Sequence, residues 1–179
     1  MRMTKIPEHY TTTVGSIEIT VAPPDHPPYS VDAIVEEQDT SLLLGDTHIV
    51  RDTSESYEAL VGKMKIQTSL VPGQVLVKHT RPWRLIAVVY DVGKKPLYRE
   101  EWIATVLEKL FREMESRRIR NIAMPLLGVT HGRYPHTDFM ELLCSVVADV
   151  QADCPEKIWL VTPGTDYVDL VACLEETRT

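Results

Sequence analysis

Apolar positions along the chain follow two patterns, a short run or alternation that predicts strands and a helical repeat that predicts helices. The clearest helix is Arg99 to Arg118, where apolar residues recur every three or four positions and Glu100 and Glu101 occupy the first turn. The predicted strands are residues 14–21, 31–35, 73–79, 84–92, 121–127 and 157–162, and the predicted helices are residues 54–65, 99–118, 137–151 and 167–176.

Strands and helices alternate over the second half of the chain, which is typical of a parallel sheet covered by helices. We therefore expect an α/β fold, a three-layer α/β/α sandwich with a mixed, mainly parallel central sheet. A length of 179 residues is most simply one domain spanning 1–179, with residues 1–12 as a loose end. In such sheets ligands bind at the carboxyl ends of strands.

One such end belongs to the segment from Asn121 to Pro135, a buried strand followed by a loop that contains Gly128 and Gly132. Thr137 or Asp138 would cap the helix that follows. Glycines allow a sharp turn and the close approach of a ligand, and N–H groups at a helix start attract anions. The segment indicates a phosphate site, but a tight turn needed only for chain reversal explains the same glycines.

Composition narrows the set of partners and cofactors. Apolar residues make up 44% of the chain and charged residues 25%, as in ordinary globular proteins, and the net charge of −7 argues against nucleic acid. No apolar run approaches the roughly 18 residues that cross a bilayer, so we expect no membrane partner and a cytoplasmic location. The three cysteines lack metal-ligand spacing, and we expect neither a metal nor a cofactor. Nothing in the sequence indicates an oligomeric state.

Three segments resemble motifs of the macro domain, an ADP-ribose-binding α/β/α module. Val31-Asp-Ala-Ile-Val35 is similar to the start of its VDAIVNAAN signature, and residues 73–77 and 88–93 are similar to its paired central strands. Ile122 to Pro135 resembles its IAFPLLGTGxGGxP strand and phosphate loop. The resemblance covers about residues 14–170.

This resemblance implies a set of ligand-binding residues. The phosphate loop would wrap a diphosphate and the distal ribose through backbone N–H groups, and it comprises Gly128, Val129, Thr130, His131, Gly132, Arg133 and Tyr134. By spacing alone Asp25 matches an acid that binds the adenine amine, although an exposed acid in a Pro-rich turn fits equally well. Tyr167 would flank the adenine, or lie in the core.

The chain also departs from the family pattern. Glu36-Glu-Gln-Asp39 stands where the family has Asn-Ala-Ala-Asn, and Leu43-Leu-Gly-Asp-Thr-His-Ile-Val50 replaces its first Gly-rich loop. In the phosphate loop, Val129-Thr130 replaces Thr-Gly. The asparagine that would bind the distal ribose is thus missing, and nearby acids would repel a diphosphate.

Three hypotheses remain on the sequence. The favoured one is a binding module for ADP-ribose or a related nucleotide diphosphate that uses the loop from Gly128 to Pro135. A second is a hydrolase of ADP-ribosyl or ADP-ribose phosphate bonds that uses His131 and the acids after Val35, namely Glu36, Glu37 and Asp39. His131 is its catalytic candidate, paired with Asp46 or His48. A solvent-facing loop histidine is the simpler interpretation of His131. The third is a macro-like scaffold with a degenerate pocket that acts through protein contacts.

Overall fold

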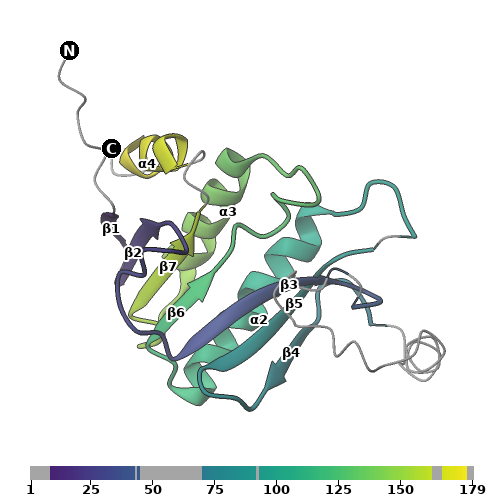
Figure 1. Cartoon of the computed structure of the whole chain (residues 1–179), viewed down its shortest axis with the longest axis horizontal. Helices are drawn as coiled ribbons and strands as arrows, with labels where there is room; N and C mark the ends of the chain where they lie inside the picture. The colour runs from purple at the N-terminus through teal and green to yellow at the C-terminus, as the bar shows by residue number, and fades with distance from the viewer. Residues whose placement is uncertain (1–8, 43, 45–69, 92, 163–166, 177–179) are drawn as a thin grey trace.

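The computed structural model describes residues 9–42, 44, 70–91, 93–162 and 167–176. Within these residues, seven strands and three helices follow one another along the chain (Figure 1). They are β1 (Tyr10–Val14), β2 (Ile17–Ala22), β3 (Ala33–Asp39), β4 (Val75–Lys78), β5 (Trp83–Tyr90), α2 (Glu100–Arg117), β6 (Asn121–Met124), α3 (His136–Asp149), β7 (Lys157–Val161) and α4 (Tyr167–Glu176).

The seven strands form one sheet in the order β1-β2-β7-β6-β3-β5-β4. The outer pairs β1–β2 and β4–β5 are antiparallel, whereas every pairing between β2 and β5 is parallel. This arrangement confirms the predicted α/β class with a mixed, mainly parallel sheet. The parallel strands β3, β6 and β7 therefore end at the same edge of the sheet.

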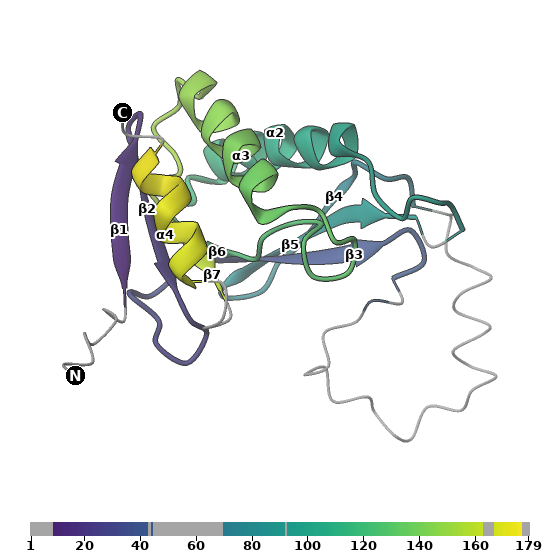
Figure 2. The same cartoon turned by 90° about the horizontal axis from the view of Figure 1, so that it is seen from above.

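The main core lies between one face of the sheet and the helices α2, α3 and α4 (Figure 2). A row of paired, fully buried residues crosses that face on four neighbouring strands, namely Ile19, Ile158, Ile122 and Ala33. The opposite face carries a smaller cluster around Ala22, Ala123 and Trp159. The predicted helix 54–65 lies outside the described residues.

The bounds of three predicted strands were wrong, one of them β6, which ends at Met124 and not at residue 127. The alternation over residues 14–21 spans a hairpin rather than one strand, because Gly15 turns the chain at φ +59 between β1 and β2. β1 also contains residues 10–12, which we expected to be loose. The strand predicted at 31–35 runs instead from Ala33 to Asp39, so the polar residues after Val35 belong to the strand and not to the next loop.

The long helices match their prediction closely, with α2 at Glu100–Arg117 and α4 at Tyr167–Glu176. The predicted cap of α3 was wrong. That helix begins at His136 behind Pro135, and no side chain makes a capping hydrogen bond there. No described helix has the length and apolar character needed to span a bilayer.

Candidate functional site

A cavity of about 510 Å³ opens at the carboxyl ends of β3, β6 and β7. One wall is the polar end of β3, from Glu36 to Gln38, and another is formed by Thr130 and His131 of the loop after β6. The strand ends meet here because β3, β6 and β7 run parallel. A volume of this order is typical of sites for small molecules.

The two glycines of the loop serve its own conformation and packing. Gly128 has φ +82, in the left-handed region that favours glycine. A Cβ at Gly132 would lie 2.6 Å from the Gly128 carbonyl oxygen, 2.7 Å from the Tyr98 ring and 2.8 Å from the Tyr90 ring. The bare backbone at Gly132 therefore permits close contact with two tyrosines of the protein itself.

The backbone N–H groups of the loop point largely at protein acceptors. That of Gly128 donates to Glu37 Oε2 at 3.1 Å, while those of His131 and Gly132 lie 3.4 and 3.3 Å from the Tyr90 hydroxyl oxygen. Loop carbonyls accept the N–H groups of Val129, Arg133 and Tyr134.

Thr130 differs from its neighbours in the loop. Among the residues that the structure describes, its backbone N–H has no hydrogen-bond acceptor, and its exposed side chain lies in the cavity wall. Judged on the described part of the chain, Thr130 is thus the loop position whose backbone donor at the cavity is left without an acceptor.

Glu37 is the central acid of the site, and its side chain is only 10% exposed. Oε2 accepts hydrogen bonds from the Tyr90 hydroxyl at 3.1 Å and from Gly128, and Oε1 lies 3.9 Å from His131 Nε2. Burial raises the pKa of Glu37, and the hydrogen bonds from Gly128 and Tyr90 oppose that rise only in part. Burial, with Glu37 beside it, also raises the pKa of Tyr90, so the phenol stays protonated and donates.

The acids on either side of Glu37 have separate partners. The carboxylate of Glu36 forms an ion pair with Arg84, with 2.5 Å between Oε1 and Nη2. Asp39 is fully buried and accepts backbone hydrogen bonds from Ser41 and Leu44 at 2.5 and 2.7 Å. Hence Glu37 is the acid of this segment that reaches the glycine loop.

The predicted site residues fall into two groups. Thr130 and His131 line the cavity, and the His131 side chain is 47% exposed beside Glu37. Arg133 is exposed at φ +58, whereas the buried Tyr134 donates its hydroxyl hydrogen to Glu100 at 3.0 Å. Asp46 and His48, proposed as partners of His131, lie outside the described residues.

The two residues predicted to contact adenine, Asp25 and Tyr167, are not among the described residues that line the cavity. Asp25 is exposed, with its Oδ1 3.2 Å from His26 Nδ1, while its neighbour Pro24 lines the cavity. Tyr167 is buried in the main core at the start of α4. Conversely, the sequence interpretation missed Glu37 and Tyr90 as a hydrogen-bonded pair. The sequence did contain a signal for this pair. Glu37 and Tyr90 each lie near the end of a predicted strand, and the two strands were expected in the same sheet.

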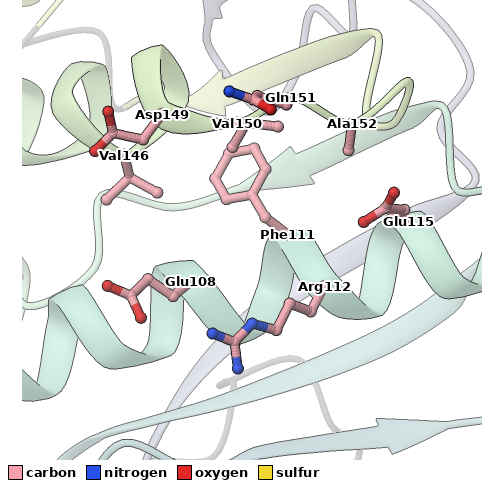
Figure 3. A pocket seen from close by; sticks show the side chains of 9 residues that line it. All are labelled: Glu108, Phe111, Arg112, Glu115, Val146, Asp149, Val150, Gln151 and Ala152. Atoms are coloured by element: carbon pink, nitrogen blue, oxygen red, sulfur yellow. The ribbon is translucent and has the colours of Figure 1, made fainter.

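A second cavity of about 510 Å³ lies between α2 and the end of α3. Figure 3 shows Phe111 of α2 pointing toward Val150 and Gln151, and Glu108 of α2 lying opposite Val146 and Asp149 of α3. None of its described lining residues comes from the strand ends, so it is separate from the glycine loop.

The fold is similar to those of solved macro domains. The Oceanobacillus iheyensis macrodomain with ADP superposes with a TM-score of 0.72 at 14% identity, covering 95% of this chain and 96% of that one. The Trypanosoma brucei macrodomain in complex with ADP gives 0.62 at 13% identity, over 87% and 68% of the two chains. The macrodomain of Thermus aquaticus DarG gives 0.56 at 19% identity, over 76% and 92%.

Sequence comparison alone finds no such relationship. No family model matches the chain. No curated protein matches it either. The likeness therefore lies in the arrangement of the backbone, and the superposition on the Oceanobacillus iheyensis macrodomain covers 95% of this chain. This chain has the macro-domain fold.

Proposed function

We propose that this protein binds ADP-ribose or a related nucleotide diphosphate in the cavity at the carboxyl ends of β3, β6 and β7. The observation that carries the proposal is the position of that cavity, with Thr130 and His131 of the glycine loop in its wall. Structures of the same fold from Oceanobacillus iheyensis hold ADP and ADP-ribose, which supports a ligand of this class.

The donors available to such a ligand are few and specific. The Thr130 N–H has no acceptor among the described residues, and the exposed side chains of His131 and Arg133 carry further donors. Apolar residues of the wall, including Ile34 and Val161, offer a surface for a less polar part of the ligand. A phosphate near Thr130 would therefore be held by a small number of hydrogen bonds.

One observation favours a second candidate, a scaffold that acts through protein contacts. Six of the seven backbone N–H groups from Gly128 to Tyr134 donate within the protein. A loop whose donors are satisfied internally gains less from binding phosphate, since each hydrogen bond to the ligand must replace an existing one. On this alternative the folded protein has no affinity for nucleotides.

Calorimetric titration with ADP-ribose separates the two candidates. We expect the wild-type protein to bind with micromolar affinity, and Thr130→Glu to weaken binding at least tenfold because it places a carboxylate in the cavity wall. Thr130 is exposed, so the substitution leaves the core intact.

The control is Ser116→Glu, which adds the same charge at an exposed position near the far end of α2. This variant should bind ADP-ribose as the wild type does. Flat titrations from wild-type protein with a native circular dichroism spectrum would reject nucleotide binding and favour the scaffold.

A further inference from the structure

The glycine loop already holds an anionic group, supplied by β3. The carboxylate of Glu37 accepts hydrogen bonds from the Gly128 N–H and from the Tyr90 hydroxyl. The oxygen of that hydroxyl in turn accepts the N–H groups of His131 and Gly132. Three donors of the loop thus converge on an internal carboxyl and its phenol partner. In a glycine loop next to a helix, converging N–H donors of this kind are the groups that would otherwise bind a phosphate.

The ionised carboxylate and a bound phosphate would exclude each other. Glu37 is nearly buried, so water screens its charge poorly, and a second anion at contact distance would be repelled strongly. A protonated Glu37 carries no charge and keeps an oxygen to accept the Gly128 N–H. Burial raises the pKa of Glu37, so the neutral carboxyl is easier to reach here than at an exposed glutamate.

We propose that the Glu37 carboxylate competes with anionic ligands for the glycine loop, and that binding of a phosphate-bearing ligand to the loop takes up one proton at Glu37. The inference rests on the proposed function. On this proposal the Glu37 carboxylate competes with the ligand for the loop. Anion binding is therefore weak at neutral pH and becomes stronger when acidification protonates Glu37.

The groups that face Glu37 come from two other elements. Tyr90 of β5 contributes a phenol that stays protonated, and the loop after β6 contributes His131, whose Nε2 lies 3.9 Å from Oε1. On β3 itself, Glu36 is paired with Arg84, and Asp39 is bound to backbone N–H groups. The experiment must therefore distinguish proton uptake by Glu37 from proton uptake by His131.

The test is titration with ADP-ribose between pH 5.5 and 7.5, in pairs of buffers whose ionisation enthalpies differ, so that protons taken up are counted. Wild-type protein should bind more tightly as the pH falls and take up close to one proton per ligand. Glu37→Gln should bind at least tenfold more tightly than wild type at pH 7.5, because Gln keeps an acceptor oxygen and loses the charge.

Two further variants assign the proton. His131→Gln should retain proton uptake, whereas Glu37→Gln combined with His131→Gln should lose it. Glu108→Gln removes the same charge from an exposed position on α2, beside the separate cavity of Figure 3, and should match wild type within about twofold.

A measurement on the wild-type protein covers the case in which Glu37→Gln fails to fold. Because coupling between a proton and a ligand is reciprocal, saturating ADP-ribose should raise the pKa of the Glu37 carboxyl, followed by its carbon-13 NMR signal. A pKa that stays fixed or falls on binding overturns the proposal.

The remaining outcomes separate this inference from the proposed function. Binding that is independent of pH and unchanged in Glu37→Gln would overturn the role of Glu37 and leave nucleotide binding intact. Folded wild-type and Glu37→Gln proteins that both fail to bind at every pH would overturn both. Binding gained only in Glu37→Gln would show that Glu37 blocks the loop, but it would overturn nucleotide binding by the wild-type protein and with it the proton uptake proposed at Glu37.

Discussion

At Gly132 the loop backbone approaches the Tyr90 and Tyr98 rings more closely than any Cβ would allow. We expect Gly132→Ala to lower the free energy of unfolding by about 1–3 kcal/mol, because the methyl group would meet both rings and the Gly128 carbonyl oxygen. Urea denaturation measures this change.

The matched control is Gly93→Ala, whose added Cβ would have its nearest contact at 3.4 Å, with Asp91. Its free energy of unfolding should stay within about 0.5 kcal/mol of wild type. Equal stability of the two variants would show that the loop moves away from the tyrosines at little cost. In that case Gly132 would not be required for packing.

At the level of elements, α2 ends in a left-handed residue that is not glycine. Arg118 has φ +53, and the N–H groups of Arg118 and Ile119 close the helix on the carbonyls of Glu115 and Met114. A side chain in this conformation costs about 1–2 kcal/mol, and the greater freedom of glycine in the unfolded chain offsets about half of that.

Arg118→Gly should therefore raise the free energy of unfolding by about 0.5–1 kcal/mol in urea denaturation. Arg117→Gly is the control one residue earlier, inside α2, where Arg117 pairs with Glu113 and lies over the Trp83 ring. It should lower stability by about 1 kcal/mol or more. Destabilisation by both substitutions would mean that Arg118 makes a contact more valuable than its backbone strain.

Elements with a long apolar repeat were predicted well, because their periodicity is local. The end of β3 was not, because what holds Glu36 and Glu37 in a strand is distant in sequence. Arg84 pairs with Glu36 across 48 residues, and the Gly128 N–H reaches Glu37 across 91. In the sequence, a run of polar residues after an apolar strand is typical of a loop. Only the distant partners of Glu36 and Glu37 show that these residues belong to the strand. The same distance hid the role of Glu37 in the candidate site, whereas the glycine loop was visible as a contiguous motif.

For the molecule as a whole, the fold is similar to that of solved macro domains although the sequences are very different. Identity to the Oceanobacillus iheyensis macrodomain is 14%, yet the backbones agree over 95% of this chain. A pattern of buried apolar positions is enough to specify the sheet and its helices, and many sequences satisfy it. The polar residues at the strand ends are not constrained in this way. The fold therefore does not require a glutamate at position 37, although it is compatible with one.

The burial of Glu37 should also leave a signature in the pH dependence of global stability. Its pKa is raised in the folded protein, whereas in the unfolded chain a glutamate titrates near its usual value of about 4.3. Between these two pKa values the folded state holds a proton that the unfolded state has lost. The contribution of Glu37 to stability is therefore fully present below about pH 4.3 and is lost as the pH rises through the folded pKa.

Glu37→Gln cannot ionise, so its stability relative to wild type should increase from pH 4 to pH 8 and level off above the folded pKa of Glu37. Urea denaturation across this range measures the difference, and Glu108→Gln, on exposed α2 surface, should show no such trend. The opposite slope would mean that the hydrogen bonds from Gly128 and Tyr90 stabilise the carboxylate by more than burial costs it. Glu37 would then stay ionised in the loop at all working pH values, and it would oppose a phosphate throughout.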